Sequence, residues 1–155
     1  MTPTEVQLDA MHIRGLARTF NMSTRSNIPQ LWADAVPLLH TMPGRVPTAT
    51  YGACIDMFAG EDGDAGFVYM AGVEVDPEAP SPEGLTTVVA PAGKYAMFTF
   101  DEHISKFPEF IDAVWSKYFP ASGYTKRKAL DFERYDERWN PVTGSGPVDY
   151  YIPID

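Results

Sequence analysis

The chain contains one helical pattern twice, about half its length apart. Ile28–Trp32 reads apolar, proline, amide, apolar, apolar, and Phe107–Ile111 repeats this order with an acid in place of the amide. Each pattern follows one strand-like run and precedes two more. These runs are residues 14–20, 51–58 and 67–75 in the first half and residues 93–100, 132–135 and 148–154 in the second. The order strand, helix, strand, strand therefore occurs twice in 155 residues, which predicts a duplicated unit with a ligand cleft on its pseudo-twofold axis.

This duplication predicts the fold class. We expect an α+β domain in which a strand-helix-strand-strand unit is repeated with pseudo-twofold symmetry, giving an antiparallel curved sheet with both long helices on one face. A chain of this length normally forms a single hydrophobic core, so one domain is expected over residues 1–155, with pseudo-repeats at about 4–76 and 85–155. Asn27 is placed to cap the first helix, Pro37 threatens to end or kink it, and the second helix is expected to open near Ser105.

Composition and charge restrict the function. The formal net charge of −9, from 12 basic and 21 acidic residues, argues against direct nucleic-acid binding and suits a cationic ligand. Cys54 is the only cysteine, so neither an intrachain disulfide nor a cysteine-based zinc site is expected, and the chain fits a reducing cytoplasm. No stretch approaches the roughly 18 apolar residues that a membrane-spanning helix needs. We therefore expect a cytoplasmic protein that does not insert into a membrane.

Metal, cofactor and nucleophile motifs are weak in this sequence. His12, His40 and His103 lie in different segments, without the spacing of a metal site. The acidic run at residues 60–64 resembles a calcium loop only in composition, and residues 60–66 read as a hairpin loop. No serine has the context of a catalytic triad, and no convincing axial ligand for haem is visible. We expect no metal, no cofactor and no catalytic residue of these kinds.

Alternation along the last two strands suggests where a ligand would bind. In residues 148–154 the even positions are uniformly apolar or aromatic, which predicts that they pack on the helices. The face opposite the helices is then expected to carry Glu133, Tyr135 and Tyr151, joined by Tyr51 and Tyr69 from the first half. A carboxylate among aromatic rings is the arrangement that holds an organic cation. The alternatives are that each tyrosine is ordinary packing and that Glu133 is a solvated residue paired with a nearby base such as Lys126 or Arg127.

Five motifs together resemble one known family. They are the strand Pro91–Phe98, which is similar to a P-x-G-x-Y-A-x-F strand, Tyr51-Gly52, the helix Ile28–Trp32, Phe132-Glu133-x-Tyr135, and the terminal residues 151–154. Taken in their order along the chain, of which they span nearly the full length, they resemble the GyrI-like, AraC-type effector-binding domains. The resemblance implies the duplicated fold expected above and a module that binds small molecules, cationic drugs among them.

The resemblance also implies a set of site residues. In drug-sensing members the glutamate of the closing strand lies at the centre of the pocket, which corresponds to Glu133. The aromatic wall of the pocket corresponds to Tyr51, Tyr69, Trp115, Tyr135 and Tyr150 or Tyr151. Many members are fused to a DNA-binding segment, and none is visible in this sequence, so direct transcriptional regulation by this chain is not expected.

These observations predict a stand-alone module that binds a small, hydrophobic, cationic organic molecule in an acidic aromatic pocket between the two repeats. The expected partners are this ligand and a possible separate DNA-binding or regulatory protein, and the chain is expected to be a monomer or a homodimer. Two alternatives remain open. One is a small-molecule hydrolase that uses a pocket glutamate with a tyrosine or tryptophan, and the other is a protein-interaction role such as inhibition of gyrase.

Overall fold

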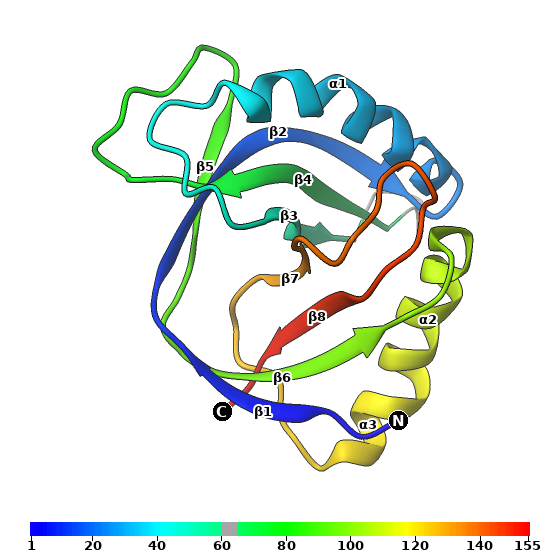
Figure 1. The fold of residues 1–155 in the computed structure, drawn as a ribbon. Coiled ribbons are helices and arrows are strands. Elements are labelled where there is room, and N and C mark those ends of the chain that lie inside the picture. Colours follow the sequence, from blue (N-terminus) through cyan, green and yellow to red (C-terminus); the bar gives the residue numbers. More distant parts are fainter. Residues whose placement is uncertain (60–64) are drawn as a thin grey trace. The chain divides into compact units, whose positions relative to one another are not determined.

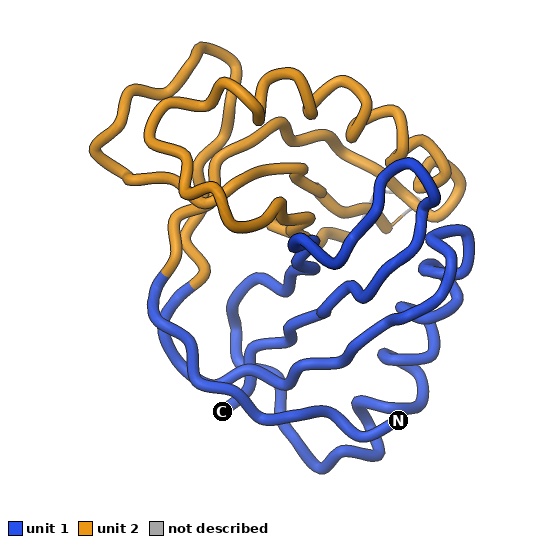
Figure 2. Tube along the Cα trace, viewed as in Figure 1, with its two compact units in different colours: residues 1–10, 91–155 blue, residues 11–90 orange. Residues whose placement is uncertain are grey.

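A computed structural model describes residues 1–59 and 65–155 and divides them into two compact units (Figure 2). Unit 1 contains residues 1–10 and 91–155, and unit 2 contains residues 11–90. The acidic run at 60–64, and with it most of the hairpin loop predicted at 60–66, lies outside the described residues. Within the described ranges no helix is both long and apolar enough to cross a membrane.

Unit 2, as described, is a four-stranded antiparallel sheet with one long helix. Its strands are β2 (Met11–Asn21), β3 (Thr50–Phe58), β4 (Gly66–Glu74) and β5 (Thr86–Ala90), in the order β3-β4-β2-β5. Helix α1 (Ile28–His40) packs against β2 and β4 (Figure 1). Its apolar stripe meets the same face of the sheet in one core, made of Phe20, Leu31, Ala35, Leu39, Met42, Tyr69, Ala71, Val73 and Val75.

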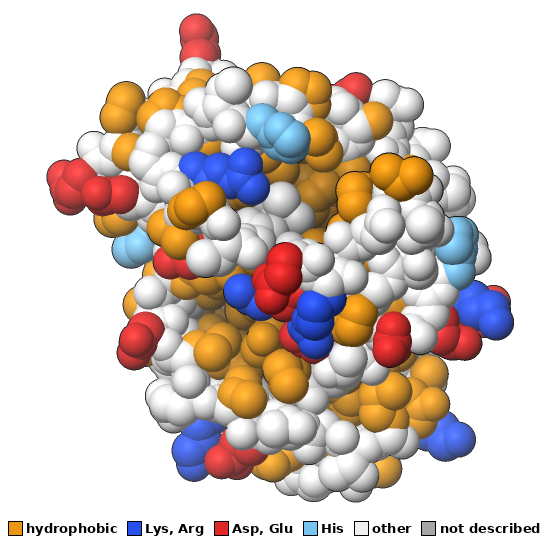
Figure 3. Space-filling model, in the orientation of Figure 1, with side chains coloured by type: hydrophobic (Ala, Val, Ile, Leu, Met, Phe, Trp, Pro, Cys, Tyr) orange, Lys and Arg blue, Asp and Glu red, His pale blue; other side chains and the backbone are white. Residues whose placement is uncertain are grey.

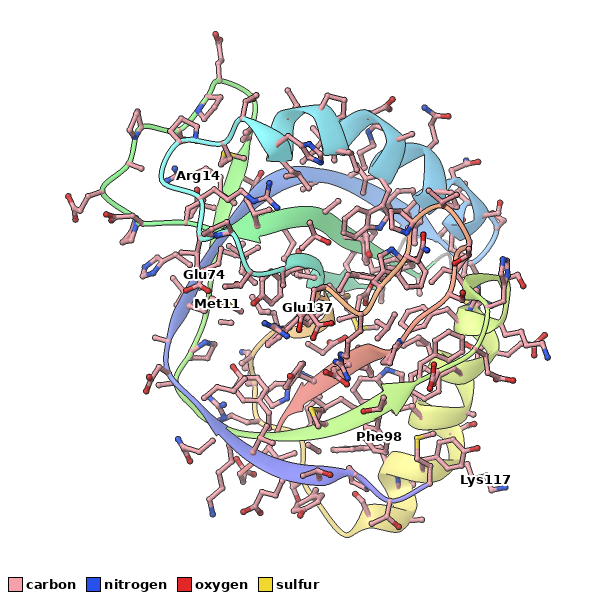
Figure 4. All side chains as sticks on the ribbon, viewed as in Figure 1. Met11, Arg14, Glu74, Phe98, Lys117 and Glu137 are labelled. Carbon is pink, nitrogen blue, oxygen red and sulfur yellow. The ribbon has the colours of Figure 1, made fainter. Side chains whose placement is uncertain are left out.

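Unit 1, which the structure describes throughout, has the same plan. Its strands are β1 (Thr4–Leu8), β6 (Gly93–Phe100), β7 (Asp131–Tyr135) and β8 (Val148–Pro153), in the order β1-β6-β8-β7. The helical segment is a turn η3 (Ile104–Lys106), helix α2 (Phe107–Ala113), a π-helical turn η4 (Val114–Tyr118) and helix α3 (Phe119–Ser122). Its core combines the helical side chains with one face of β6 and β8, and includes Phe98, labelled in Figure 4.

The duplication is therefore confirmed at the level of strands and helices. The order β2-α1-β3-β4 in one unit matches β6-α2-β7-β8 in the other, and both sheets are antiparallel, as the α+β expectation requires. Two strands were not predicted, β1 and β5, and each pairs with the opposite repeat: β1 with β6, and β5 with β2. The outer limits of the predicted domain and repeats stay predictions.

Prolines shape both helical segments. Pro29 and Pro108 lie in the first turn, where a missing N–H costs nothing because that donor has no helical partner. Helix α1 begins directly after Asn27, as predicted, although the Asn27 side chain makes no capping hydrogen bond, and it continues through Pro37 to His40. The second segment widens into the π-helical turn just before Pro120, whose ring cannot tolerate the carbonyl four residues earlier in regular α-helical geometry.

Candidate functional site

Glu133 is buried on the helix-covered face of unit 1. It lies in the middle of β7, opposite Tyr150 of β8, and only 6% of its surface is exposed. The hydroxyl of Tyr135, two residues further along the strand, donates a hydrogen bond of 3.3 Å to Glu133 Oε1. The solvated surface residue of the alternative interpretation is therefore excluded, because Glu133 is not exposed.

Tyr150 of β8 forms hydrogen bonds both to the helical segment of unit 1 and to strand β7. The indole N–H of Trp115, on the π-helical turn, donates to the Tyr150 hydroxyl oxygen at 3.1 Å. The Tyr150 hydroxyl in turn donates to the carboxyl group of Asp131, a second buried acid on β7. Burial raises the pKa of Asp131. Burial also raises the pKa of Tyr150, and the neighbouring carboxyl groups of Asp131 and Glu133 raise it further. The two hydrogen bonds that join Trp115, Tyr150 and Asp131 therefore lie beside Glu133.

Half-buried aromatic rings lie next to Asp131 and Glu133, the two buried acids of β7 that we call the acidic region. The rings of Tyr135 and Trp139 meet edge to face with centroids 5.3 Å apart, and both pack against the core of unit 1. Trp139 lies in the loop after β7, which ion pairs hold in place. Arg138 binds Asp136 at 2.9 Å and Asp149 of β8 at 2.7 Å, and its hydrogen bonds hold the pKa of Asp136 below its usual range. The hydrogen-bond donor to Glu133, Tyr135, is therefore itself partly exposed and packed against Trp139.

The structure corrects the predicted face of the site. Glu133 and Tyr135 were expected opposite the helices, with Tyr151, but the strand register places Glu133 opposite Tyr150, which belongs to the core under the helix. Residues directly opposite in an antiparallel pair share a face, so Glu133 lies on the helix side. The error has a simple cause. Alternation within one strand fixes two faces, but only the register between β7 and β8 decides which faces coincide.

Tyr151 belongs to a different cluster, on the other face of this sheet. Its ring stacks on Phe132 with centroids 4.9 Å apart, and Tyr95 meets Phe132 edge to face at 5.6 Å. The guanidinium of Arg127 lies 5.3 Å from the centre of the Tyr95 ring. Hydrophobic side chains are visible in the part of Figure 3 where Figure 1 draws β6 and β8. This cluster already holds a protein cation, whereas the buried acids lie on the opposite face.

Unit 2 repeats the aromatic pair without the acids. The indole N–H of Trp32 on α1 donates to the hydroxyl of Tyr69 on β4, again at 3.1 Å. Cys54 lies opposite Tyr69, as Glu133 lies opposite Tyr150, and Gly52 corresponds to Asp131. Tyr51, also predicted to line the pocket, lies on the other face of this sheet, because it is paired with Gly72 next to the helix-facing Ala71. The two repeats therefore share a tryptophan–tyrosine hydrogen bond but differ in charge.

Two residues in or beside the acidic region were missed from the sequence. Asp131 stands two positions before Glu133, so strand alternation alone could have placed both acids on one face. Trp139 follows the strand in a loop, and no local pattern indicates that it folds back on Tyr135. Within residues 1–59 and 65–155, no group of three histidine, cysteine or acidic side chains is arranged to hold a metal ion.

Comparison with known proteins identifies the family. Residues 1–155 match the sequence profile of the GyrI-like small molecule binding domain. The chain belongs to this family. It is 35% identical over 137 residues to the transcriptional regulator BrlR of Pseudomonas aeruginosa, a match covering 87% of the chain and 49% of BrlR. The chain thus spans about half the length of that relative.

Solved structures agree on the fold of this GyrI-like domain. SAV2435, solved with bound tetraphenylphosphonium, superposes with a TM-score of 0.73 at 17% identity, covering 100% of this chain and 94% of that one. A hydrolase of Listeria innocua superposes with a TM-score of 0.54 at 9% identity, covering 99% and 92%. At such low identities the likeness shows the fold, and the family shows that the domain binds small molecules.

Proposed function

We propose that this GyrI-like domain binds a small hydrophobic organic cation at Glu133. The observation that carries the proposal is the buried carboxylate of Glu133 beside Tyr135 and Tyr150, with Trp115 hydrogen-bonded above. A carboxylate attracts a cation more strongly away from water than in it. Each aromatic ring that faces the cation adds about 0.5–2 kcal/mol. Together these groups favour a lipophilic cation over a neutral or anionic molecule of the same shape.

The difference between the repeats supports this assignment. Both contain the tryptophan–tyrosine hydrogen bond, so that pair alone is explained by packing of helix on sheet. Only unit 1 adds acids, with Asp131 and Glu133 at the positions that Gly52 and Cys54 occupy in unit 2. SAV2435, which has this fold, was solved with tetraphenylphosphonium, a lipophilic cation. We centre the proposal on the residues that unit 1 brings together, while Tyr51, Tyr69 and Tyr151, and a pocket between the repeats, remain predictions.

The decisive experiment compares two probes of the same shape and opposite charge. Titration calorimetry with tetraphenylphosphonium and tetraphenylborate is expected to show binding of the cation alone. Glu133→Gln keeps the shape and removes the charge, so the affinity for tetraphenylphosphonium should fall about tenfold or more. Glu109→Gln, at an exposed position of helix α2, makes the same change in net charge and should leave the affinity unchanged. Equal binding of both probes, or equal affinity of wild type and Glu133→Gln, contradicts the proposal.

The duplicated tryptophans provide a second, matched pair of variants. Trp115→Phe and Trp32→Phe each remove one indole donor to a tyrosine hydroxyl, so both should lower the free energy of unfolding by about 1 kcal/mol. Only Trp115→Phe should weaken tetraphenylphosphonium binding, because only Trp115 lies beside the acids. The same loss of affinity in Trp32→Phe would show that the effect is structural and not a property of the site.

The carboxyl pair supports one alternative, a small-molecule hydrolase. Burial raises the pKa of Asp131 and favours its neutral form, so Asp131 could act as an acid while Glu133 acts as a base. This alternative requires multiple turnovers of an electrophilic substrate that Glu133→Gln abolishes, measured by mass spectrometry of the products. Binding without turnover supports the binding module instead.

We place this activity in the cytoplasm, because the chain contains a single cysteine and therefore needs no oxidising compartment for an intrachain disulfide. The acidic charge disfavours direct contact of this domain with nucleic acid. We therefore propose that a separate DNA-binding or regulatory protein recognises the ligand-bound form of this domain. We propose further that the domain acts as a monomer or a homodimer.

A further inference from the structure

One edge of strand β2 lacks a partner over half of its length. On one side β2 pairs with β4 from Ile13 to Asn21, but on the other side β5 pairs only with residues 11–15. Two residues before β5 begins, Gly84 adopts a φ of +83°, which is typical of a turn, so the chain before Gly84 does not continue strand β5. From Leu16 to Asn21 this side of β2 therefore faces no other strand among the described residues.

The backbone groups that address this open edge can be assigned. In an antiparallel strand the N–H and C=O of one residue point to the same edge, and successive residues alternate. The carbonyl of His12 accepts a hydrogen bond from the N–H of Val75, just past the end of β4. The backbone N–H and C=O of even-numbered residues of β2 therefore point toward β4, and those of odd-numbered residues point toward the side of β5. Asn21 fits this assignment, because its N–H donates to Thr24 Oγ1 at 2.8 Å rather than to the strand beside it. Ala17 and Thr19 thus present two donors and two acceptors to the open edge.

A cleft of about 500 Å³ lies along this edge. Its wall consists of Arg18, Thr19 and Phe20 from β2 and of Thr24, Asn27 and Gln30 from the start of the helical segment. Consecutive residues of β2 line it, so it follows the edge of the strand and not one face of the sheet. The lining residues are polar apart from Phe20, and an extended polypeptide can match such a mixture of polar and apolar surface.

We propose that the Leu16–Asn21 edge of β2 is a docking site for an extended, acidic peptide segment of a partner protein. The segment would add to unit 2 as an antiparallel strand in line with β5 and make four main-chain hydrogen bonds with Ala17 and Thr19. Edge strands are usually protected by charge, proline or bulges, and Arg18 is the single charged side chain on this stretch. This site is independent of the Glu133 site.

The charge of Arg18 selects the occupant. If two copies of the chain paired through this edge, the hydrogen bonds of Ala17 and Thr19 would place Arg18 directly opposite its own copy, and like charges in that position are destabilising. Two chains of net charge −9 would also repel each other. A carboxylate of a partner segment opposite Arg18 has the complementary charge. Asp34 binds Arg18 at 2.7 Å, but both side chains are about 40% exposed, so that ion pair is weak enough to be shared.

The test uses the full chain and a synthetic probe, the capped peptide Thr-Val-Glu-Val-Thr, whose glutamate would lie opposite Arg18. Binding should slow amide exchange at Ala17 and Thr19 and shift their NMR signals. N-methylation of both valines removes the donors that face β2 and should weaken binding about tenfold or more, whereas N-methylation of the glutamate, whose N–H points away, should have little effect. Replacing the probe glutamate by lysine should also weaken binding, and Arg18→Gln should remove that preference.

Three results would overturn the proposal. They are absence of binding at millimolar peptide, equal affinity of the two N-methylated peptides, and a dimer of this chain that the peptide dissociates. Thr19→Pro removes one donor on the open edge and should abolish binding, with Thr19→Ala as the control that keeps the backbone N–H. Because the N-methylated peptides probe wild-type protein, the outcome does not depend on folding of the variants.

Discussion

At the scale of single residues, the two acids of β7 have different hydroxyl partners. Tyr135 donates to Glu133, and Tyr150 donates to Asp131 while accepting from Trp115. The Tyr150 hydroxyl bonds Asp131 and Trp115, whereas Glu133, which lies directly opposite Tyr150, accepts from Tyr135. Asp131 therefore holds Tyr150 in place, and Glu133 is the acid to which we assign the cation.

Asp131 should make stability depend on pH in a specific direction. Burial raises its pKa in the folded protein above the unfolded value, so the protonated form stabilises the fold. That contribution is fully present below the unfolded pKa and is lost as pH rises through the folded pKa. Asp131→Asn keeps an acceptor for Tyr150 and cannot ionise, so the wild type should lose stability relative to this variant as pH rises from the unfolded pKa of an aspartate, about 4, toward alkaline values. Urea midpoints across this range measure the difference.

Asp34 provides a control, because its stability contribution should change with pH in the opposite direction to that of Asp131. Its hydrogen bond from Arg18 lowers its pKa, so its contribution is present above the unfolded pKa and is lost as pH falls through the folded pKa. Relative to Asp34→Asn, the wild type should therefore gain stability as pH rises. Parallel pH profiles of wild type and Asp131→Asn would contradict the raised pKa of Asp131.

At the scale of elements, helix α1 tolerates a proline where a helix normally ends. Pro37 lies in the interior of α1, on an exposed position, and cannot donate to the carbonyl of Ala33. The helix continues because Leu31, Ala35 and Leu39 pack into the core of unit 2 on both sides of the proline. Burial of this stripe outweighs the local penalty, since packing supplies most helical stability in proteins.

Replacing this proline should stabilise the protein. An interior proline costs about 3 kcal/mol, offset by about 1 kcal/mol because it restricts the unfolded chain, so Pro37→Ala should raise the free energy of unfolding by about 1–2 kcal/mol. Pro29→Ala is the matched control, because proline is favoured in the first turn and its loss should be neutral or destabilising. Urea denaturation of the three proteins decides this, and a destabilised Pro37→Ala would show that the proline is locally unstrained.

At the scale of the whole molecule, the two repeats exchange their leading strands. Strand β1 precedes β2 in the chain but pairs with β6 in unit 1, and β5 precedes β6 but pairs with β2 in unit 2. Each unit is therefore completed by a strand from the other repeat (Figure 2). This exchange ties folding of the two units together, because neither repeat contains all of its own sheet.

Removing β1 should therefore affect a strand that is distant in sequence. A variant lacking residues 1–8 should show faster amide exchange in residues 93–97 of β6, which lose their antiparallel partner, while β2 keeps its protection. Hydrogen exchange followed by mass spectrometry measures both strands in one experiment. Faster exchange in β2 with unchanged β6 would contradict the exchange of strands.

The sequence alone determined both helical segments, six of the described strands and the order of these elements along the chain. The duplicated pattern, the prolines after Asn27 and before Glu109, and the strand 93–100 are local signals, because helices and strands are set by residues a few positions apart. The same local patterns, with their resemblance to a known family, singled out Glu133. Strands β1 and β5 were missed because short edge strands carry little alternation of their own.

Only the tertiary structure decided which side chains meet. Pairing of β7 with β8 set Glu133 opposite Tyr150 and separated it from Tyr151, and folding of the loop after β7 brought Trp139 to Tyr135. Burial of Asp131, and with it the raised pKa, also follows from this packing. The physical reason is that a shift of one residue in strand register reverses both faces, and register depends on contacts that are distant in the chain.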